Sequence, residues 1–310
     1  MKQKSIRQEF ADTVLEVGKE DENLIVLIGD ISHFILQPFA KACPGRFYNI
    51  GICEPTIVSI AAGLSKMGFY PVVHTISPFL VERSFEQIKL DFCYQRLGGN
   101  IITVGSAFDY SNLGCTHHCY GDFALFKTLQ NVRLFYPSSA VEFKTLFRQA
   151  YNSDFLNYYR IPEALNDFNY SPKSIKIGKG YTIAEGSDTT LLVVGPHIKN
   201  ALKAREIMAG KRSIEVIYLN TIRPLDKELI RSSIEKTKHV VVVEEHMLSG
   251  GLCDDVRRIT SDMEHVRYAS VCIPDKFINA YGTYNDHCKK LGFTPQGIVE
   301  KINETAVDPS

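Results

Sequence analysis

Two segments of the chain place acidic, imidazole and thiol side chains where they could do chemistry. The first is Gly51-Ile-Cys-Glu54, which runs into the small-residue stretch Ile60-Ala-Ala-Gly63. We expect Glu54 to lie largely out of water beside this stretch, where a carboxylate is costly unless it has a partner. Acidic side chains also stabilise the first turn of helices. Glu54 is therefore either a structural helix cap or an acid/base group tuned by burial.

The second segment runs from Gly105 to Cys119. Its Cys115-Thr-His-His-Cys119 stretch combines thiol and imidazole groups, and both bind zinc. These residues are too close together for all four side chains to converge on one tetrahedral ion, and the sequence has no second pair at finger-like spacing. We therefore expect a polar active-site loop with incidental cysteines and no metal site in this chain.

Size and composition narrow the class of protein. The 310 residues are enough for two domains, each with its own core. Lysine plus arginine equals aspartate plus glutamate at 35 each, and no cluster of one sign indicates a nucleic-acid or membrane partner. Neither a signal peptide nor a membrane span is evident, and eight irregularly spaced cysteines favour reduced thiols. We expect a cytoplasmic protein.

Strands and helices alternate along both halves of the sequence. In the first half the pattern predicts helices over 5–19, 56–67 and 79–94, and strands over 24–29, 46–50, 70–75, 100–104 and 155–160. In the second half it predicts strands over 189–195, 214–218 and 239–243, and helices over 198–209 and 226–236. This alternation predicts two parallel-sheet α/β domains, over residues 1–165 and 166–310. Ligands collect at the carboxyl ends of such strands, where Asp30, Thr75 and Gly105 fall.

Four segments, in this order, resemble the pyrimidine-binding domain of transketolases, which are thiamine-diphosphate enzymes. They are the Glu54 segment, Phe79-Leu-Val-Glu-Arg-Ser-Phe-Glu-Gln87, the loop over 105–118, and Leu129-Gln-Asn-Val-Arg-Leu-Phe-Tyr-Pro137. The last third resembles the transketolase C-terminal domain. The resemblance covers nearly the whole chain and implies a pyrimidine-binding (Pyr) domain followed by that C-terminal domain.

The resemblance also implies roles for residues near the cofactor. In this family a glutamate hydrogen-bonds N1′ of the pyrimidine and favours the imino tautomer that takes the proton from thiazolium C2, and Glu54 matches it. Phe79 matches the aromatic residue that stacks on the pyrimidine, which orients the ring for this proton relay. Ile76 lines the same pocket. Arg83 either acts through its charge near the cofactor or faces solvent.

Two further matches concern the sugar substrate. His117 matches the histidine that polarises the donor sugar's carbonyl and hydroxyl groups, and a group that titrates near neutral pH suits that work. Its neighbour His118 is secondary. Arg160 matches an arginine that holds the sugar phosphate. A planar guanidinium suits that role, since it can bind phosphate through two hydrogen bonds. The alternative for Arg160 is a solvent-exposed salt bridge.

The sequence departs from the family pattern in the same loop. Many transketolases have an aspartate before the Gly-x-Thr-His element, where it contacts donor hydroxyl groups, but this chain has Leu113. Asp109 is near enough in the loop to compensate. Asp30 and His74 are further candidate substrate contacts at strand ends. Leu113 leaves the identity of the ketose donor open.

The sequence lacks the Gly-Asp-Gly…Asn motif through which such enzymes hold the diphosphate and its metal ion. The resemblance therefore implies the C-terminal subunit of a split transketolase, whose N-terminal subunit carries the diphosphate with Mg²⁺ or Ca²⁺. The expected assembly is an α2β2 heterotetramer with cofactor at the interfaces. The expected reaction is transfer of a two-carbon ketol unit between (phospho)sugars.

Three other functions stay open. One is the β-subunit of a 2-oxo-acid dehydrogenase E1, against which the Thr116-His117-His118 element argues. Another is a specialised transketolase-like synthase for unusual or deoxy sugars, which Leu113 favours. The third is a catalytically silent scaffold, which the presence of Glu54, Phe79 and His117 in the expected order disfavours.

Overall fold

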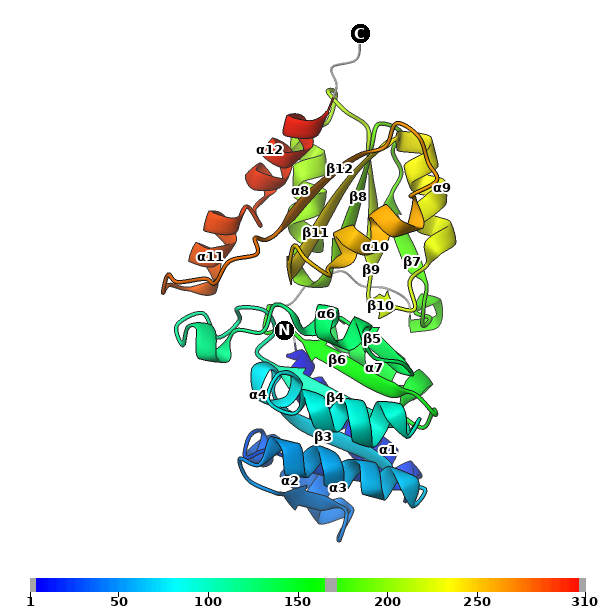
Figure 1. Ribbon diagram of the computed structural model, residues 1–310, viewed down its shortest axis with the longest axis vertical. Coiled ribbons are helices and arrows are strands. Elements are labelled where there is room, and N and C mark those ends of the chain that lie inside the picture. The colour runs from blue at the N-terminus through cyan, green and yellow to red at the C-terminus, as the bar shows by residue number, and fades with distance from the viewer. Residues whose placement is uncertain (1–3, 165–171, 307–310) are drawn as a thin grey trace.

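The computed structural model describes residues 4–164 and 172–306, which form two α/β domains placed end to end (Figure 1). The helices of the first domain are α1 (Ile6–Glu20), α2 (His33–Ala42), α3 (Glu54–Lys66), α4 (Ser77–Val81), α5 (Phe85–Gln87), the π-helix η1 (Ile88–Tyr94), the 3₁₀-helix η2 (Cys115–His117), α6 (Asp122–Lys127) and α7 (Ala140–Ala150). Its strands are β1 (Leu24–Ile28), β2 (Phe47–Asn49), β3 (Tyr70–Ile76), β4 (Gly99–Val104), β5 (Val132–Phe135) and β6 (Leu156–Ile161).

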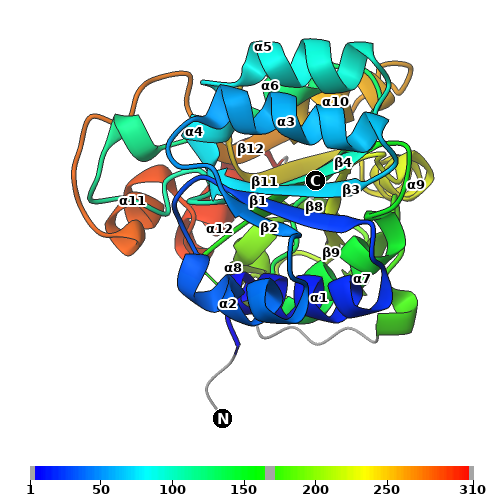
Figure 2. The same ribbon diagram turned by 90° about the horizontal axis from the view of Figure 1, so that it is seen from below.

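The first sheet has the strand order β10-β5-β6-β4-β3-β1-β2, and all its neighbours are parallel except β10 with β5. Helices α1, α2 and α7 cover one face, and α3 and α5 lie on the other (Figure 2). Both faces are therefore screened from water, which explains why β1, β4 and β6 are buried along their whole length.

The second domain contains β7 (Gly180–Ala184), β8 (Thr189–Val194), β9 (Ile214–Leu219), β10 (Thr221–Arg223), β11 (His239–Met247) and β12 (Arg267–Ile273). Its helices are η3 (Pro172–Ser174), η4 (Gly195–His197), α8 (Ile198–Ile207), α9 (Lys227–Thr237), α10 (Leu252–Ile259), α11 (Tyr284–Leu291) and α12 (Pro295–Thr305). The sheet order is β12-β11-β8-β9-β7, and only β7 pairs antiparallel, with β9.

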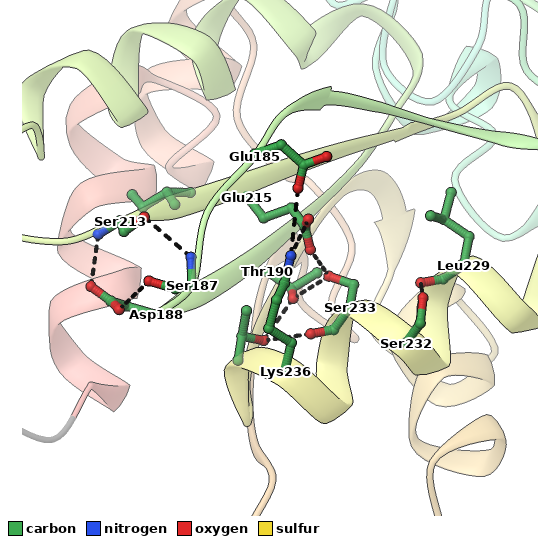
Figure 3. A network of polar contacts seen from close by, with 12 residues as sticks. Glu185, Ser187, Asp188, Thr190, Ser213, Glu215, Leu229, Ser232, Ser233 and Lys236 are labelled. Atoms are coloured by element: carbon green, nitrogen blue, oxygen red, sulfur yellow. Dashed lines mark hydrogen bonds and ion pairs between the residues drawn. The ribbon is translucent and has the colours of Figure 1, made fainter.

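A polar network ties α9 to the second sheet. Lys236 on α9 lies 2.6 Å from Glu215 on β9, and Ser233 also donates a hydrogen bond to that carboxylate (Figure 3). Thr190 on β8 hydrogen-bonds Ser233 at 2.6 Å. Because Glu215 is almost fully buried, these partners replace the water that its carboxylate loses.

The two domains share buried polar contacts and one sheet. The short strand β10 leaves the second domain and adds an antiparallel edge to the first sheet. At the same junction, the Tyr136 hydroxyl donates to Glu245 Oε2 at 2.9 Å and the Tyr218 hydroxyl donates to Glu142 Oε2 at 3.1 Å. The expected boundary at residues 165/166 lies outside the described residues.

The expected strands and helices are present with small shifts at their ends, but the single helix expected over 79–94 is not. The chain instead forms α4, turns at 82–84, and resumes as α5 and the π-helix η1. At the turn, the backbone N–H of Arg83 donates to the Pro78 carbonyl at 3.3 Å. The turn directs the Arg83 side chain to Glu54, a tertiary contact that helical periodicity does not encode.

Candidate active site at the carboxyl edge of the first sheet

Glu54 begins α3 and is 1% exposed, as the small residues after it predict. Further along α3, Ala61 and Ala62 belong to the same buried cluster as Leu27 and Val73 of the first sheet. The Glu54 carboxylate Oε2 accepts a hydrogen bond from Arg83 Nη1 at 2.8 Å, which is also an ion pair. Its side chain is thus engaged with an arginine from the α4–α5 turn.

Phe79 lies on α4, directly after the carboxyl end of β3, and is half-buried. The Arg83 guanidinium carbon lies 4.5 Å from the centre of the Phe79 ring, over its face. Ile76, the last residue of β3, is also half-buried and precedes α4. Arg83 therefore contacts both Glu54 and Phe79, and Ile76 lies at the entrance to α4.

His117 reaches the same cluster from the loop after β4. Its ring meets the Phe79 ring edge-on, with the centroids 5.1 Å apart, and lies 6.2 Å from the Tyr110 ring. Thr116 Oγ1 is 2.9 Å from His117 Nδ1, which fixes one side of the imidazole. His118 points elsewhere and is buried, and burial lowers its pKa to about 4, so it stays neutral near pH 7.

Asp109 is buried and holds the loop that carries His117. Its Oδ2 accepts hydrogen bonds from the Ser106 N–H at 3.0 Å and the Ser106 hydroxyl at 2.9 Å. It also accepts one from the Glu163 N–H at 3.0 Å. Burial, with repulsion from Glu245 next, raises the pKa of Asp109 to about 8. Asp109 therefore holds its own loop together through these three hydrogen bonds.

His74 is fully buried within the first sheet. Its Nδ1 is 2.8 Å from the Ile102 carbonyl, so this nitrogen carries the proton, and its Nε2 is 2.8 Å from Ser32 Oγ. Burial lowers the pKa of His74 to about 3. The imidazole thus ties β3 to the β1–α2 loop. It reaches neither His117 nor Glu54 by any contact among the described residues.

Asp30 lies in that β1–α2 loop and is exposed. It has a left-handed backbone, with φ of 57°. Its N–H donates to Asn49 Oδ1 at 3.1 Å, and Asn49 Nδ2 donates back to Asp30 Oδ1 at 3.0 Å. This pairing fixes the loop and leaves the second carboxylate oxygen toward solvent.

Arg160 is fully buried at the end of β6. Its Nε lies 3.3 Å from Asp122 Oδ2, and one Nη donates to the Cys119 carbonyl at 3.1 Å. The rings of Phe123 and Tyr136 each lie 4.8 Å from its guanidinium carbon. The alternative prediction of a solvent-exposed salt bridge is therefore wrong, because the ion pair of Arg160 with Asp122 is buried. As it stands, the guanidinium is also closed to a phosphate.

Within the described ranges, one group of three residues has ligand-type atoms mutually within 4.8 Å, namely His197, Glu245 and Cys288. It lies at the domain junction, where His197 Nε2 contacts Glu245 Oε1 at 2.8 Å. The Cys115–Cys119 stretch forms no such group, and Cys115 is exposed whereas Cys119 is buried. Across residues 4–164 and 172–306, no helix is long and apolar enough to cross a membrane.

Tyr281 lies beside the loop that carries His117, and the sequence analysis did not predict this contact. A Cβ atom added to Gly114 would lie 3.0 Å from the ring of Tyr281, so this exposed tyrosine of the second domain packs on the loop three residues before His117. Tyr281 follows β12 in a stretch without regular structure. Because the two residues are far apart in the chain, no local pattern could have paired them.

Comparison with known proteins gives the family. Residues 2–164 match the model of the transketolase pyrimidine-binding domain, and residues 178–298 match that of the transketolase C-terminal domain. The chain is 29% identical over 307 residues to a putative transketolase C-terminal section from Methanocaldococcus jannaschii, covering 97% of this chain and 96% of that protein. It is 30% identical over 303 residues to one subunit of an apulose-4-phosphate transketolase from Phocaeicola vulgatus, covering 96% of each.

A solved structure agrees with these relatives. It is a split-gene transketolase in the form of an inactive β4 tetramer, with a TM-score of 0.87, 27% identity and coverage of 98% of both chains. The chain also matches 1-deoxy-D-xylulose-5-phosphate synthases but spans about half their length. One from Pelotomaculum thermopropionicum is 30% identical, with 95% of this chain and 47% of the synthase covered. With both of its domains matched over nearly their full length, this chain belongs to the transketolase family.

Proposed function

We propose that the chain is the C-terminal subunit of a split transketolase, which moves a two-carbon ketol unit between (phospho)sugars with thiamine diphosphate. The observation that carries the proposal is the Phe79 ring, which contacts both the His117 imidazole and the Arg83 guanidinium that binds the buried Glu54 carboxylate. The family and the relatives named as a subunit or section of a transketolase support it.

These residues fit the pyrimidine half of the cofactor. Thiamine diphosphate supplies a carbon nucleophile at its thiazolium C2. Glu54 would hold or share a proton at N1′, and its burial keeps water from competing for that hydrogen bond. Phe79 would offer a ring face for stacking and Ile76 an apolar contact. His117 would donate to, or accept from, oxygens of the sugar.

The rest of the site would come from a partner. We propose an N-terminal subunit that carries the diphosphate with Mg²⁺ or Ca²⁺, in an α2β2 assembly. Apolar side chains beside the candidate site support an interface there, because Ile52 is 69% exposed two residues before Glu54 and Phe34 is 79% exposed on α2. Four more exposed apolar side chains lie on α3, η1 and the turn after α3, namely Ile60, Met67, Leu90 and Tyr94.

For the sugar, we propose His117 and Asp30 as contacts from this chain, since both are accessible. Asp109, His74 and Arg160 were predicted as contacts, but their side chains are buried in hydrogen bonds and ion pairs of the chain itself. We assign these three to the support of the loops that carry the site.

The proposal predicts that cofactor binding requires a partner subunit and that ketol transfer requires Glu54. Calorimetry with thiamine diphosphate and Mg²⁺ should detect tight binding by the chain mixed with a candidate N-terminal subunit and none by the chain alone. In the assembled enzyme, Glu54→Gln should lower ketol transfer roughly 10²–10⁴-fold, the usual contribution of a proton-transfer group. The matched control is Glu86→Gln on the exposed side of α5, which should keep full activity.

Tight cofactor binding by the isolated chain, or near-normal turnover by Glu54→Gln, would contradict the proposal. A second candidate is a synthase for deoxy sugars, which the 1-deoxy-D-xylulose-5-phosphate synthase relatives and Leu113 favour. Release of carbon dioxide from a 2-oxo acid donor, in place of ketol transfer from a ketose, would select it.

A further inference from the structure

Arg83 makes two contacts at the candidate site. Its Nη1 is 2.8 Å from Glu54 Oε2, and its guanidinium carbon lies 4.5 Å from the centre of the Phe79 ring. These are the carboxylate and the aromatic face that the proposed function gives to the cofactor's aminopyrimidine. A guanidinium and an aminopyrimidine are both flat, and both present nitrogen atoms to a carboxylate while stacking on a ring.

We propose that Arg83 occupies the place of the pyrimidine in the cofactor-free chain and must leave when the cofactor binds. This inference rests on the proposed function, because it takes Glu54 and Phe79 as the pyrimidine contacts. A flat group stacked on this face of Phe79 and bonded to this carboxylate oxygen leaves no room for a second one there.

The contact stabilises the free chain. The Glu54 side chain is 2% exposed, and a buried carboxylate without a partner is costly. Arg83 provides the counter-charge, while nearly half of its own side chain (47%) stays exposed to solvent. The Arg83 guanidinium thus compensates the charge of the buried Glu54 carboxylate while remaining partly exposed itself.

Arg83 is also able to move away. It lies in the turn over 82–84 between α4 and α5, outside regular helix. Among the described residues its guanidinium makes no other hydrogen bond or ion pair than that to Glu54. Swinging it into solvent therefore breaks two modest interactions and disturbs no strand or helix.

The displacement should cost cofactor affinity. A partly exposed ion pair and a cation–π contact are each worth about 0.5–1 kcal/mol. Their loss together corresponds to about a tenfold weaker affinity for thiamine diphosphate than the same site would have without Arg83. On this proposal Arg83 competes with the cofactor, a role different from the two that the sequence left open, which were a charge near the bound cofactor and a solvent-facing side chain.

The test is the affinity of the assembled two-subunit enzyme for thiamine diphosphate with Mg²⁺, measured by calorimetry. Arg83→Met should bind about tenfold more tightly than wild type. Arg83→Lys, which keeps the charge but loses the flat stacking group, should fall between them. The matched control is Arg133→Met, because Arg133 makes a similar contact, 4.0 Å over the Phe155 ring, at the opposite edge of the sheet.

A second measurement needs no partner. The isolated Arg83→Met chain should unfold at a lower temperature than wild type, because Glu54 loses its counter-charge. Equal or weaker cofactor binding by assembled Arg83→Met would overturn the displacement, since Arg83 would then be neutral or part of the bound site. If neither wild type nor variant binds the cofactor when assembled, the proposed function fails instead.

Discussion

Replacing Asp122 by asparagine should destabilise the first domain, because it removes the counter-ion of the buried Arg160. The Arg160 side chain is 0% exposed, and its Nε lies 3.3 Å from Asp122 Oδ2. An arginine keeps its proton in proteins, so the buried charge cannot be neutralised. The remaining compensation would come from the faces of Phe123 and Tyr136, the Cys119 carbonyl and the electrostatic attraction of the buried Glu245 carboxylate.

The magnitude follows from this geometry. Breaking a buried ion pair by removing one partner costs about 3–5 kcal/mol. The two aromatic faces and the carbonyl retain part of the stabilisation, so we expect the free energy of unfolding to fall by about 3 kcal/mol, near the lower end of that range. For a domain of the size of the first domain, that corresponds to a fall in Tm of roughly 6–12 °C.

The opposite variant should behave differently. Arg160→Met leaves a carboxyl that can take up a proton, and burial already raises the pKa of Asp122 above its ordinary value of 3.8 despite the arginine. A raised folded-state pKa means that the folded chain holds more protons, so stability is lost as pH rises from about 4. The deficit of Arg160→Met should therefore be small at pH 5 and grow toward pH 8.

The free energy of unfolding of both variants can be measured by urea titration of the full chain at pH 5 and pH 8, with circular dichroism as the signal. The double variant should recover part of the loss of Asp122→Asn, because the unpaired cation is gone. If Arg160→Met leaves stability unchanged at both pH values but raises KM for a sugar phosphate in the assembled enzyme, the reasoning is refuted. Arg160 would then be the phosphate ligand that the family resemblance implied.

Two further predictions concern buried carboxyl groups. Burial acts to raise the pKa of Glu215, but the hydrogen bonds from Lys236 and Ser233 outweigh it and lower the pKa (Figure 3). Lys236→Met should therefore lower the free energy of unfolding by about 1 kcal/mol at pH 7, since Lys236 is partly exposed, and the deficit should vanish below pH 4.5 in urea titrations. If the stability deficit of Lys236→Met were the same at low pH as at pH 7, its cause would be the lost packing of the Lys236 side chain and not the lost ion pair. Burial raises the pKa of Asp109 to about 8. The wild-type chain should therefore lose stability relative to Asp109→Asn as pH rises from 4 to 9. Thermal melts in which the difference in Tm between the two chains does not change with pH would show that another group holds the proton.

Much of the fold was predictable because its central strands are short apolar runs. β8 consists of Thr, Leu and Val, and β11 has four valines in a row after His239, as expected for strands covered on both faces. The strands β5 and β12 were not predicted, and neither were the antiparallel edge strands β7 and β10. Each of these two edge strands pairs with a distant strand through tertiary contacts, and β10 has only three residues, too few for a periodic pattern.

The site was predictable only in part. The order of Glu54, Phe79 and His117 carried enough information to place them together. His74, Asp109 and Arg160 also lie at or near strand ends, but whether a strand-end side chain faces the ligand edge or the interior depends on what covers it. For Arg160 the cover is α6 and Tyr136, and neither is evident from the strand's own sequence.

The pyrimidine contacts that we propose for Phe79 and Glu54 would be too few to hold the cofactor alone. One stacked ring contributes about 0.5–1.5 kcal/mol and one hydrogen bond to a charged group about 1.5–3 kcal/mol. Their sum corresponds at best to a Kd on the order of 1 mM, before the cost of moving Arg83 is counted. Useful affinity must therefore come from groups that bind the diphosphate, for which the sequence has no motif. The exposed Ile52, two residues before Glu54, marks the side from which a partner could supply them, so that cofactor binding and subunit assembly would reinforce one another.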